Sequence, residues 1–394
     1  MKSKNISIGL AILIVLALTG CSGRKSTQIV TGADQTEAYL PDLERKNVGL
    51  TINNSSLIGN KSSLDSLFSL GIKVVKIFGP EHGFRGNASD GAPIPNDIDE
   101  KTGVPAISLY GDHNKPTPEE MVGIDVMIFD IQDVGVRFYT FLSTLHYVME
   151  ACAENNVRLI VLDRPNPNGF YVDGPIREEE YKSFIGTDPI PAVHGMTFGE
   201  YAEMLNGEGW LANGVKCDLK VVRLLNYNHS KPYVSPVPPS PNLNTQQSIL
   251  LYPSLCFFEG TVISQGRGTH FPFTVLGNPE LQGKYSFSFT PDSIKGMSEH
   301  PPFRGKVCYG IDLRGYNTDI FRETGRINLS WLIEFYNAYP DKEHFFNSYF
   351  ELLAGTAKLR EQIIAGKTEE EIRASWEPGL SEFKQIRSKY LLYD

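Results

Sequence analysis

Residues 125–162 contain three patterns that decide the fold: DVMIFDI at 125–131, FYTFLSTLHYVMEACAEN at 138–155 and LIVL at 159–162. The first and last runs are short and almost wholly apolar, which is typical of strands buried on both faces. The middle run spaces its apolar residues as a helix does. The order strand, helix, strand predicts two parallel strands joined by a crossover helix.

The same alternation continues on the upstream side of this unit. Apolar runs predict short strands at residues 48–52, 74–78 and 106–109. Helical spacing predicts helices at 62–70 and 118–122. We therefore expect a Rossmann-like parallel sheet, covered by helices on both faces, over residues 41–240.

A proline-rich stretch, VSPVPPSP at residues 234–241, ends this regular pattern. Proline fits neither the interior of a helix nor a central strand, so we expect a boundary or a structured crossover there. The later patterns are strand-like at 261–263 and 306–313 and helical at 329–338, 344–353 and 356–365. The fold class is thus α/β, with a smaller α+β domain expected over residues 241–394.

Composition excludes several classes of protein. The 394 residues are 41% hydrophobic and 21% charged, which is ordinary for a globular chain and unlike a disordered or collagen-like one. The formal net charge is −9 and no basic tract interrupts it, so neither nucleic acid nor an anionic membrane surface is an expected partner.

The first residues have the pattern of a targeting segment. Lys2 and Lys4 precede the apolar run 6–18, which is too short to cross a membrane comfortably and is typical of a secretory signal. The run ends in LTGC, and small residues before Cys21 resemble the lipobox of bacterial lipoproteins.

The lipobox resemblance implies a signal peptide over residues 1–20 and a tether over 21–40. Cys21 would carry the lipid and anchor the protein on the periplasmic side of the inner or outer membrane of the cell envelope. The alternative is an ordinary secretory signal with an incidental cysteine. In such an oxidising compartment cysteines can pair, but their wide spacing favours buried free thiols over disulfides or a zinc site for Cys152, Cys217, Cys256 and Cys308.

Carboxylates follow three of the predicted strands. Glu81 follows 74–78, Asp130 and Asp133 end the strand at 125–131, and Asp163 follows 159–162. Ligands of open parallel sheets bind outside the carboxyl ends of the strands, so these side chains predict a polar site on one rim. Alternatively, the Asp residues are turn formers and helix caps.

Two segments offer more specific chemistry. Glu81 beside an aromatic residue, Phe84, is a candidate general acid, with a capping role as the alternative. Glycine-flanked Arg267 can bind an anion bidentately, or simply pair with Glu259.

Several familiar sites are absent from the sequence. It contains no GxGxxG, no GxxxxGK[ST], no HExxH and no GxSxG motif, so we expect no nucleotide cofactor and no serine nucleophile. A metal-dependent hydrolase that uses Glu81, His82 and Asp130 is kept as a rival, although adjacent Glu and His side chains point apart on an extended backbone.

Six motifs in order resemble the exo-β-N-acetylmuramidase (NamZ-like) family of glycoside hydrolases, over about residues 45–394. They are GPEHGFRG at 79–86, FDIQDVGVRFYT at 129–140, LDRPNP at 162–167, HGMTFGE at 194–200, PSPN at 239–242, and EGT with GRGT at 259–261 and 266–269. The resemblance implies a Rossmann-like domain followed by an α+β domain, with the active cleft between them. It further implies release of N-acetylmuramic acid from the non-reducing ends of peptidoglycan fragments, without a cofactor.

The resemblance also assigns roles to residues. Glu81 is expected to be the acid/base, oriented by His82, and the second carboxylate is Glu259, Asp133 or Asp130. The lactyl carboxylate of muramic acid is expected to meet Arg267, Arg137 or Arg164, because a guanidinium is a planar fork. Asn166, Asn242 and Tyr139 are candidates for the acetamido and hydroxyl groups, and Asp130 and Asp163 complete the substrate-binding set.

One position departs from the family pattern. Gln265 stands where members usually carry an acidic residue. This difference supports a second rival, a non-catalytic lipoprotein that binds cell-wall glycan in the same cleft.

Overall fold

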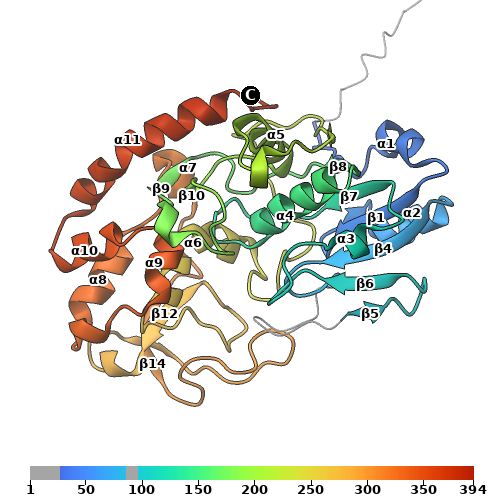
Figure 1. Ribbon diagram of the computed structural model, residues 1–394. Helices are drawn as coiled ribbons and strands as arrows, with labels where there is room; N and C mark the ends of the chain where they lie inside the picture. Colours follow the sequence, from blue (N-terminus) through green and yellow to red (C-terminus); the bar gives the residue numbers. More distant parts are fainter. Residues whose placement is uncertain (1–26, 86–95) are drawn as a thin grey trace, which may run out of the picture.

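The computed structural model describes residues 27–85 and 96–394. The expected signal peptide and Cys21 lie outside the described residues. The Rossmann-like part and the C-terminal part lie side by side, and helix α11 (Glu369–Ser388) runs along one border of the molecule (Figure 1).

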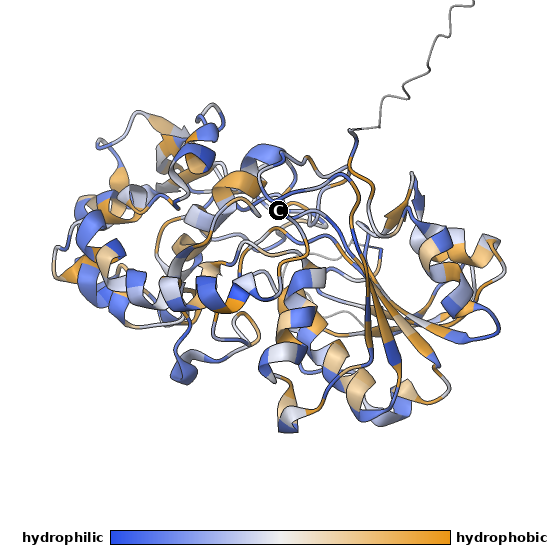
Figure 2. Ribbon diagram, turned by 90° about the horizontal axis from the view of Figure 1, so that it is seen from above, coloured by the Kyte–Doolittle hydropathy of each residue, from blue (hydrophilic) through white to orange (hydrophobic). Residues whose placement is uncertain are grey.

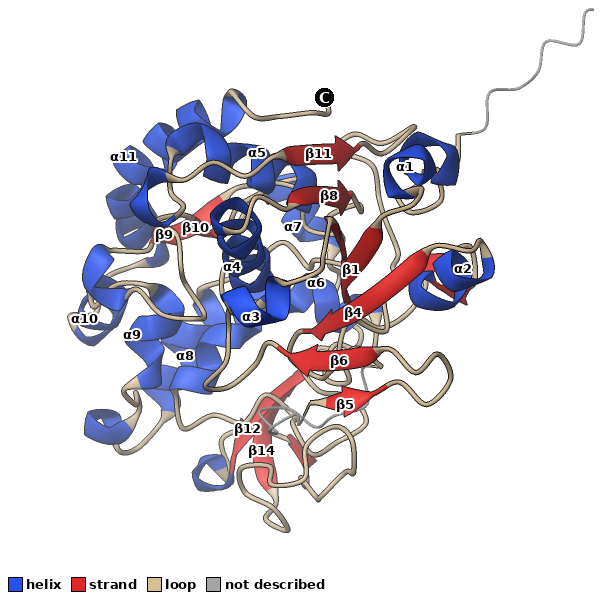
Figure 3. Ribbon diagram, turned by 45° about the vertical axis from the view of Figure 1, so that its right-hand side comes forward, coloured by secondary structure: helices blue, strands red, loops and turns tan. Residues whose placement is uncertain are grey.

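Within the described residues, seven strands form the main sheet in the order β11-β8-β7-β1-β4-β6-β5 (Figure 3). Neighbouring strands are parallel except at the β5 edge. The strands are β1 (Asn47–Ile52), β4 (Lys73–Gly79), β5 (Asp97–Ile98), β6 (Pro105–Ser108), β7 (Val126–Asp130), β8 (Arg158–Leu162) and β11 (Leu219–Val222). The chain winds from β1 to β4 and β6, then returns to β7, β8 and β11, so the topological switch point lies between β1 and β7.

Alternation along the strands explains the two helical layers. Met127 and Phe129 of β7 face one side, where they join a core with helices α3 (Pro118–Met121), α4 (Phe141–Glu154) and α5 (Phe198–Glu208). Val126 and Ile128 face the other side, with helices α1 (Thr36–Leu43) and α2 (Ser63–Ser69). The strands are therefore mainly hydrophobic along their whole length, as Figure 2 shows.

The C-terminal part contains a small antiparallel sheet and a set of helices. The sheet has the order β12-β14-β13, from β12 (Val275–Asn278), β13 (Phe287–Phe289) and β14 (Cys308–Asp312). The helices besides α11 are α6 (Gln246–Leu255), α7 (Asp319–Thr324), α8 (Ser330–Ala338), α9 (Tyr349–Ala354) and α10 (Lys358–Ile364). Two further antiparallel pairs join β2 (Leu57–Ile58) with β3 (Lys61–Ser62), and β9 (Asp173–Ile176) with β10 (Pro191–Val193). The expected fold class, a Rossmann-like sheet followed by a smaller α+β part, is confirmed.

A continuous core joins the two parts. Phe129 and Tyr201 of the Rossmann-like part belong to the same buried cluster as Phe335 and Trp376 of the C-terminal part. The end of the chain also returns to the sheet, where the Tyr393 hydroxyl donates a hydrogen bond of 2.6 Å to the Asp163 carboxylate. The two parts therefore pack as one body.

Two local expectations are wrong. Residues 261–263 form no strand, because Thr261 makes only a single bridge, to Phe346. The helix expected from residue 344 begins at Tyr349, whose backbone N–H donates to the Asn347 side chain at 2.9 Å. Because the Asn347 side chain accepts this N–H, α9 begins later than the apolar spacing predicts.

Candidate active site

A tight turn after β4 carries Glu81. The Gly83 N–H donates to the Pro80 carbonyl at 2.9 Å, and His82 and Gly83 both have positive φ, 70° and 75°. A side chain at Gly79 would meet the Phe84 backbone nitrogen at 2.8 Å, so the chain can fold back over the strand end only with glycine there. Left-handed backbone at a histidine is costly and gathers at functional sites. The turn holds Glu81 half-buried and His82 buried.

The start of α4 faces Glu81. The Thr140 hydroxyl donates a hydrogen bond of 2.8 Å to Glu81 Oε2, instead of capping its own helix. Next to it, burial raises the pKa of Tyr139 well above its ordinary value, and the charges of Glu81 and Asp133 raise it further. Tyr139 therefore remains a protonated phenol, a hydrogen-bond donor, across the physiological pH range.

Glu259 and Arg267 come from the C-terminal part. Glu259 lies in the 3₁₀ turn Cys256–Gly260, and its Oε1 accepts a hydrogen bond of 2.9 Å from Arg267 Nη2. The Arg267 guanidinium lies over the Phe273 ring, 5.0 Å from its centroid. Glycines 266 and 268, with φ of 79° and 80°, make the turn that brings Arg267 to this place. The side chains of Glu259 and Arg267 keep exposures of 19% and 13%, so the pair lies at an accessible surface.

These segments enclose a small pocket of about 40 Å³. Its walls come from both parts of the protein, including the crossover after the proline-rich stretch. The lining residues are Glu81, His82, Phe138, Tyr139, Thr140, Ser240, Asn242, Leu243, Tyr252, Arg267 and Phe273. Asn242 Nδ2 donates to the Met297 carbonyl at 3.2 Å, whereas its buried Oδ1 has no hydrogen-bond partner among the described residues. The pocket thus combines a carboxylate, a phenol, a guanidinium and an available amide oxygen.

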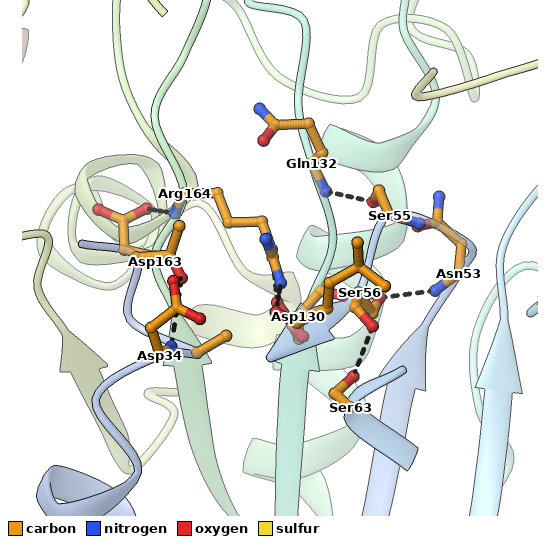
Figure 4. Close-up of polar contacts among 12 residues, drawn as sticks. Asp34, Asn53, Ser55, Ser56, Ser63, Asp130, Gln132, Asp163 and Arg164 are labelled. Carbon is orange, nitrogen blue, oxygen red and sulfur yellow. Dashed lines mark hydrogen bonds and ion pairs between the residues drawn. The ribbon is translucent and has the colours of Figure 1, made fainter. Parts of the chain in front are cut away.

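The structure places Asp130 and Arg164 elsewhere, at the switch point between β1 and β7. Arg164 Nε binds Asp130 Oδ1 at 2.6 Å, and both side chains are almost completely buried (Figure 4). Arg164 Nη2 also donates to the Leu57 carbonyl at 2.8 Å. Gln132 fills the neighbouring space and accepts a hydrogen bond of 3.0 Å from the Tyr233 hydroxyl. The usual ligand position of a doubly wound sheet is therefore occupied by side chains of this protein.

Three further candidates also have structural partners. Asp163 accepts hydrogen bonds from the Thr197 hydroxyl at 2.7 Å and the Gly199 N–H at 2.9 Å, and burial raises the pKa of Asp163 to about 6. Arg137 is buried and donates from Nη2 to the Leu353 and Ala354 carbonyls, at 3.0 and 2.9 Å.

Asn166 bridges the Met196 carbonyl and the Asn168 N–H, both at 2.8 Å. Like Asp163 and Arg137, it is absent from the pocket lining. These three residues therefore hold the scaffold together.

Asp133 lies behind the pocket. It is 2% exposed, and its Oδ2 is 3.3 Å from His194 Nε2. His194 Nδ1 accepts the Met196 N–H at 3.2 Å, so a neutral imidazole carries its proton on Nε2, toward Asp133. The charge of Asp133 is one of the smaller causes that raise the pKa of Tyr139. Gln265, the departure from the family pattern, is buried and donates to the Ile263 carbonyl at 2.5 Å.

Sequence reasoning missed Tyr349, at the start of α9. Its side chain is 37% exposed, and desolvation and the charges of Glu259 and Glu81 raise the pKa of Tyr349. The phenol therefore remains protonated. No pattern in the sequence indicates this residue. It follows Asn347 by two positions, and Asn347 Nδ2 donates to the Glu259 carbonyl at 3.3 Å, a contact that only the structure shows.

Metal donors do not gather at this site. Across residues 27–85 and 96–394, no group of three or more His, Cys, Asp or Glu side chains is arranged to hold a metal ion, and Glu81, His82 and Asp130 form no such group. In the same part of the chain, no helix has both the length and the apolar character needed to span a bilayer.

The pocket lined by the Glu81 carboxylate thus takes residues from the Rossmann-like part and from the α+β part. Two family models match nearly the whole chain: exo-β-N-acetylmuramidase NamZ, N-terminal, over residues 48–247, and NamZ, C-terminal, over residues 250–393. The chain belongs to this NamZ family.

Individual relatives agree with the family assignment. The chain is 40% identical, over 393 aligned residues, to the peptidoglycan β-N-acetylmuramidase NamZ of Bacillus subtilis strain 168, covering 94% of this chain and 92% of the relative. Two crystal structures of DUF1343 family proteins from Bacteroides fragilis have the same fold. The first is 46% identical with a TM-score of 0.86, and covers 93% of this chain and 99% of its own. The second is 30% identical with a TM-score of 0.80, and covers 94% and 100%.

Proposed function

We propose that this protein is an exo-β-N-acetylmuramidase that releases N-acetylmuramic acid from the non-reducing ends of peptidoglycan fragments. The observation that carries the proposal is the pocket in which Glu81, Tyr139, Asn242 and Arg267 converge. The activity named for the Bacillus subtilis relative supports the same reaction.

In this proposal Glu81 is the proton donor to the leaving glycosidic oxygen. The Thr140 hydroxyl holds one carboxyl oxygen, Oε2, at 2.8 Å and so fixes the orientation of the other. The buried His82 follows Glu81 in the same turn and lines the same pocket. Glu259 is the second carboxylate, because it is accessible and held by Arg267, whereas Asp133 and Asp130 are enclosed. It either attacks the sugar or activates water.

The remaining polar groups match the substituents of muramic acid. Asn242 Oδ1 can accept the acetamido N–H, and the Tyr139 phenol can donate to a sugar oxygen. Arg267 has five donors, so it can pair with Glu259 and still contact the lactyl carboxylate.

The test is turnover of a chromogenic aryl β-N-acetylmuramide by the purified protein, with the N-acetylglucosaminide as a control for the lactyl group. We expect release from the muramide alone. On a disaccharide substrate, whose leaving sugar hydroxyl needs a proton, Glu81→Gln should lose about 10²–10⁴ in kcat, the range of general acid catalysis. Thr51→Ser, a buried change on β1 away from the pocket, is the matched control. Tight glycan binding without turnover would favour a wall-binding lipoprotein, and no cleavage between pH 5 and 8 would remove the proposal.

We also propose that Cys21 carries a lipid anchor and that the protein acts on the periplasmic side of a cell-envelope membrane. The support is the LTGC pattern at the end of the apolar run. Cys21→Ala should move the protein from the membrane fraction to the soluble fraction of lysed cells. An unchanged distribution would contradict the anchor.

A further inference from the structure

A larger pocket, separate from the one around Glu81, lies in the C-terminal part. It is formed by the end of α8, the turn before α9, and α10, and its volume is about 470 Å³. This volume is in the range of small-ligand sites, about 300–1,000 Å³. Its lining includes Tyr336, Lys342, Phe346, Asn347 and Ile364. The reaction proposed above assigns no role to any of these residues.

The turn before α9 forms a wall between this pocket and the catalytic carboxylates. Asn347 lines the larger pocket, while its backbone N–H donates to the Gly260 carbonyl at 2.9 Å and its Nδ2 donates to the Glu259 carbonyl at 3.3 Å. The contact is close because Gly260 has no side chain: a Cβ there would lie 2.3 Å from Phe350 Cα. One short turn thus has the larger pocket on one side and the active site on the other.

The lining combines aromatic rings and two cations, which suit an acidic sugar, with two carboxylates, Glu343 and Glu351, of which Glu351 is paired with Arg360. The Tyr336 and Phe346 rings stack with centroids 5.6 Å apart and an interplanar angle of 25°. The half-buried Phe346 also packs against Phe345 and Phe350, at centroid distances of 4.8 and 4.5 Å, so a ligand can contact only the part of its ring that faces the pocket. Lys342 Nζ lies 5.3 Å from the Tyr336 ring centroid, and no carboxylate in the described part of the chain pairs with it. Arg360 is already paired with Glu351 at 2.7 Å, so Lys342 is the cation left to meet a ligand.

We infer that this pocket binds the leaving part of the glycan, the sugar units on the reducing side of the cleaved bond, with a carboxylate of that part on Lys342. The inference rests on the proposed function. The pocket around Glu81, about 40 Å³, is far smaller than the roughly 300–1,000 Å³ of small-ligand sites, so it can take only part of the terminal sugar. The rest of the glycan must therefore leave through the opening and cross the adjoining surface. The Asn347 turn leads from Glu259 to the aromatic pair, and muramic acid units supply the carboxylates.

The experiment compares two substrates in the same full-length variants. The aryl β-N-acetylmuramide carries one sugar and cannot reach the larger pocket, whereas a tetrasaccharide peptidoglycan fragment can. We expect Lys342→Glu and, separately, Ile364→Asp to lower kcat/KM for the tetrasaccharide at least tenfold more than for the aryl glycoside. Lys384→Glu, the same charge change at an exposed position on α11, is the matched control and should keep the ratio of the two values at that of the wild type.

The possible results separate the subsite from the proposed function. A tenfold or larger change of the ratio in both variants supports the subsite. An unchanged ratio, with the aryl glycoside still cleaved, overturns the subsite and leaves the proposed function intact. A wild-type protein that cleaves neither substrate overturns the proposed function, and the subsite with it.

Discussion

Replacing Arg164 by methionine tests whether the ion pair at the switch point is structural. Arg164 and Asp130 are buried and 2.6 Å apart, and removing one partner of such a pair costs about 3–5 kcal/mol. Protonation of the stranded Asp130 limits this cost. At pH 7, neutralising a carboxyl of ordinary pKa ~3.9 costs roughly 4 kcal/mol, and at pH 5 it costs roughly 1.5 kcal/mol. The variant should therefore be less stable than the wild type by about 4 kcal/mol at pH 7, and by less than half of that at pH 5.

Urea unfolding at the two pH values measures this difference, and Arg158→Met is the control. Arg158 also pairs with a carboxylate, Asp218 at 2.9 Å, but its side chain is 45% exposed, so its loss should cost under about 1 kcal/mol. Below the unfolding transition, Arg164→Met should keep its kcat/KM on the aryl muramide within a few fold. An unchanged free energy of unfolding together with a hundredfold loss of kcat/KM would refute the argument, since Arg164 would then contact substrate.

Two other predictions concern a buried histidine and the missed tyrosine. His146 is hydrogen-bonded to Asp188 and Glu150, both at 3.0 Å; although burial opposes its charge, these carboxylates raise the pKa of His146 from 6.5 to about 9. The stabilising effect of the charged His146 should be complete below pH 6.5 and disappear as the pH rises through about 9. Urea unfolding should therefore show a loss of ~3 kcal/mol over this range. The His146→Gln variant should not show this loss. Tyr349→Phe should lower kcat/KM on the aryl muramide about tenfold, the value of one hydrogen bond, with Tyr285→Phe on the far side of α8 as control. An equal effect in both tyrosine variants would argue against a role for Tyr349 at the site.

The Rossmann-like part could be predicted because its strands are buried on both faces. Runs such as 125–131 and 159–162 are almost wholly apolar, and the helix between them has a clear apolar face. The longest helix, α11, was not expected. Its buried residues Ile372, Trp376, Leu380 and Phe383 do have helical spacing, but Pro378 and Gly379 interrupt the pattern and the rest of the helix is polar. Packing against the body of the protein outweighs the proline.

The candidate site could be predicted only in part, for a physical reason. Strand ends can be placed on one rim from the sequence, and Glu81 is indeed on that rim, in the pocket. Which carboxylate faces a cavity and which pairs with a neighbouring guanidinium depends on contacts of high sequence separation. The Asp130–Arg164 pair and the Arg137 contacts to Leu353 and Ala354 are of this kind. Tyr349 was invisible for the same reason, since it reaches the site across more than 250 residues of chain from Glu81.

Because the pocket takes its walls from both sides of the proline-rich crossover, the protein cannot be treated as two exchangeable modules. A hybrid that joins the first part of one relative to the second part of another would have to inherit matching surfaces at Glu81 and at Glu259 together. Substrate preference in this family should therefore change through coordinated substitutions on both parts. Exchanging one whole part between relatives should produce proteins that fold but have no activity.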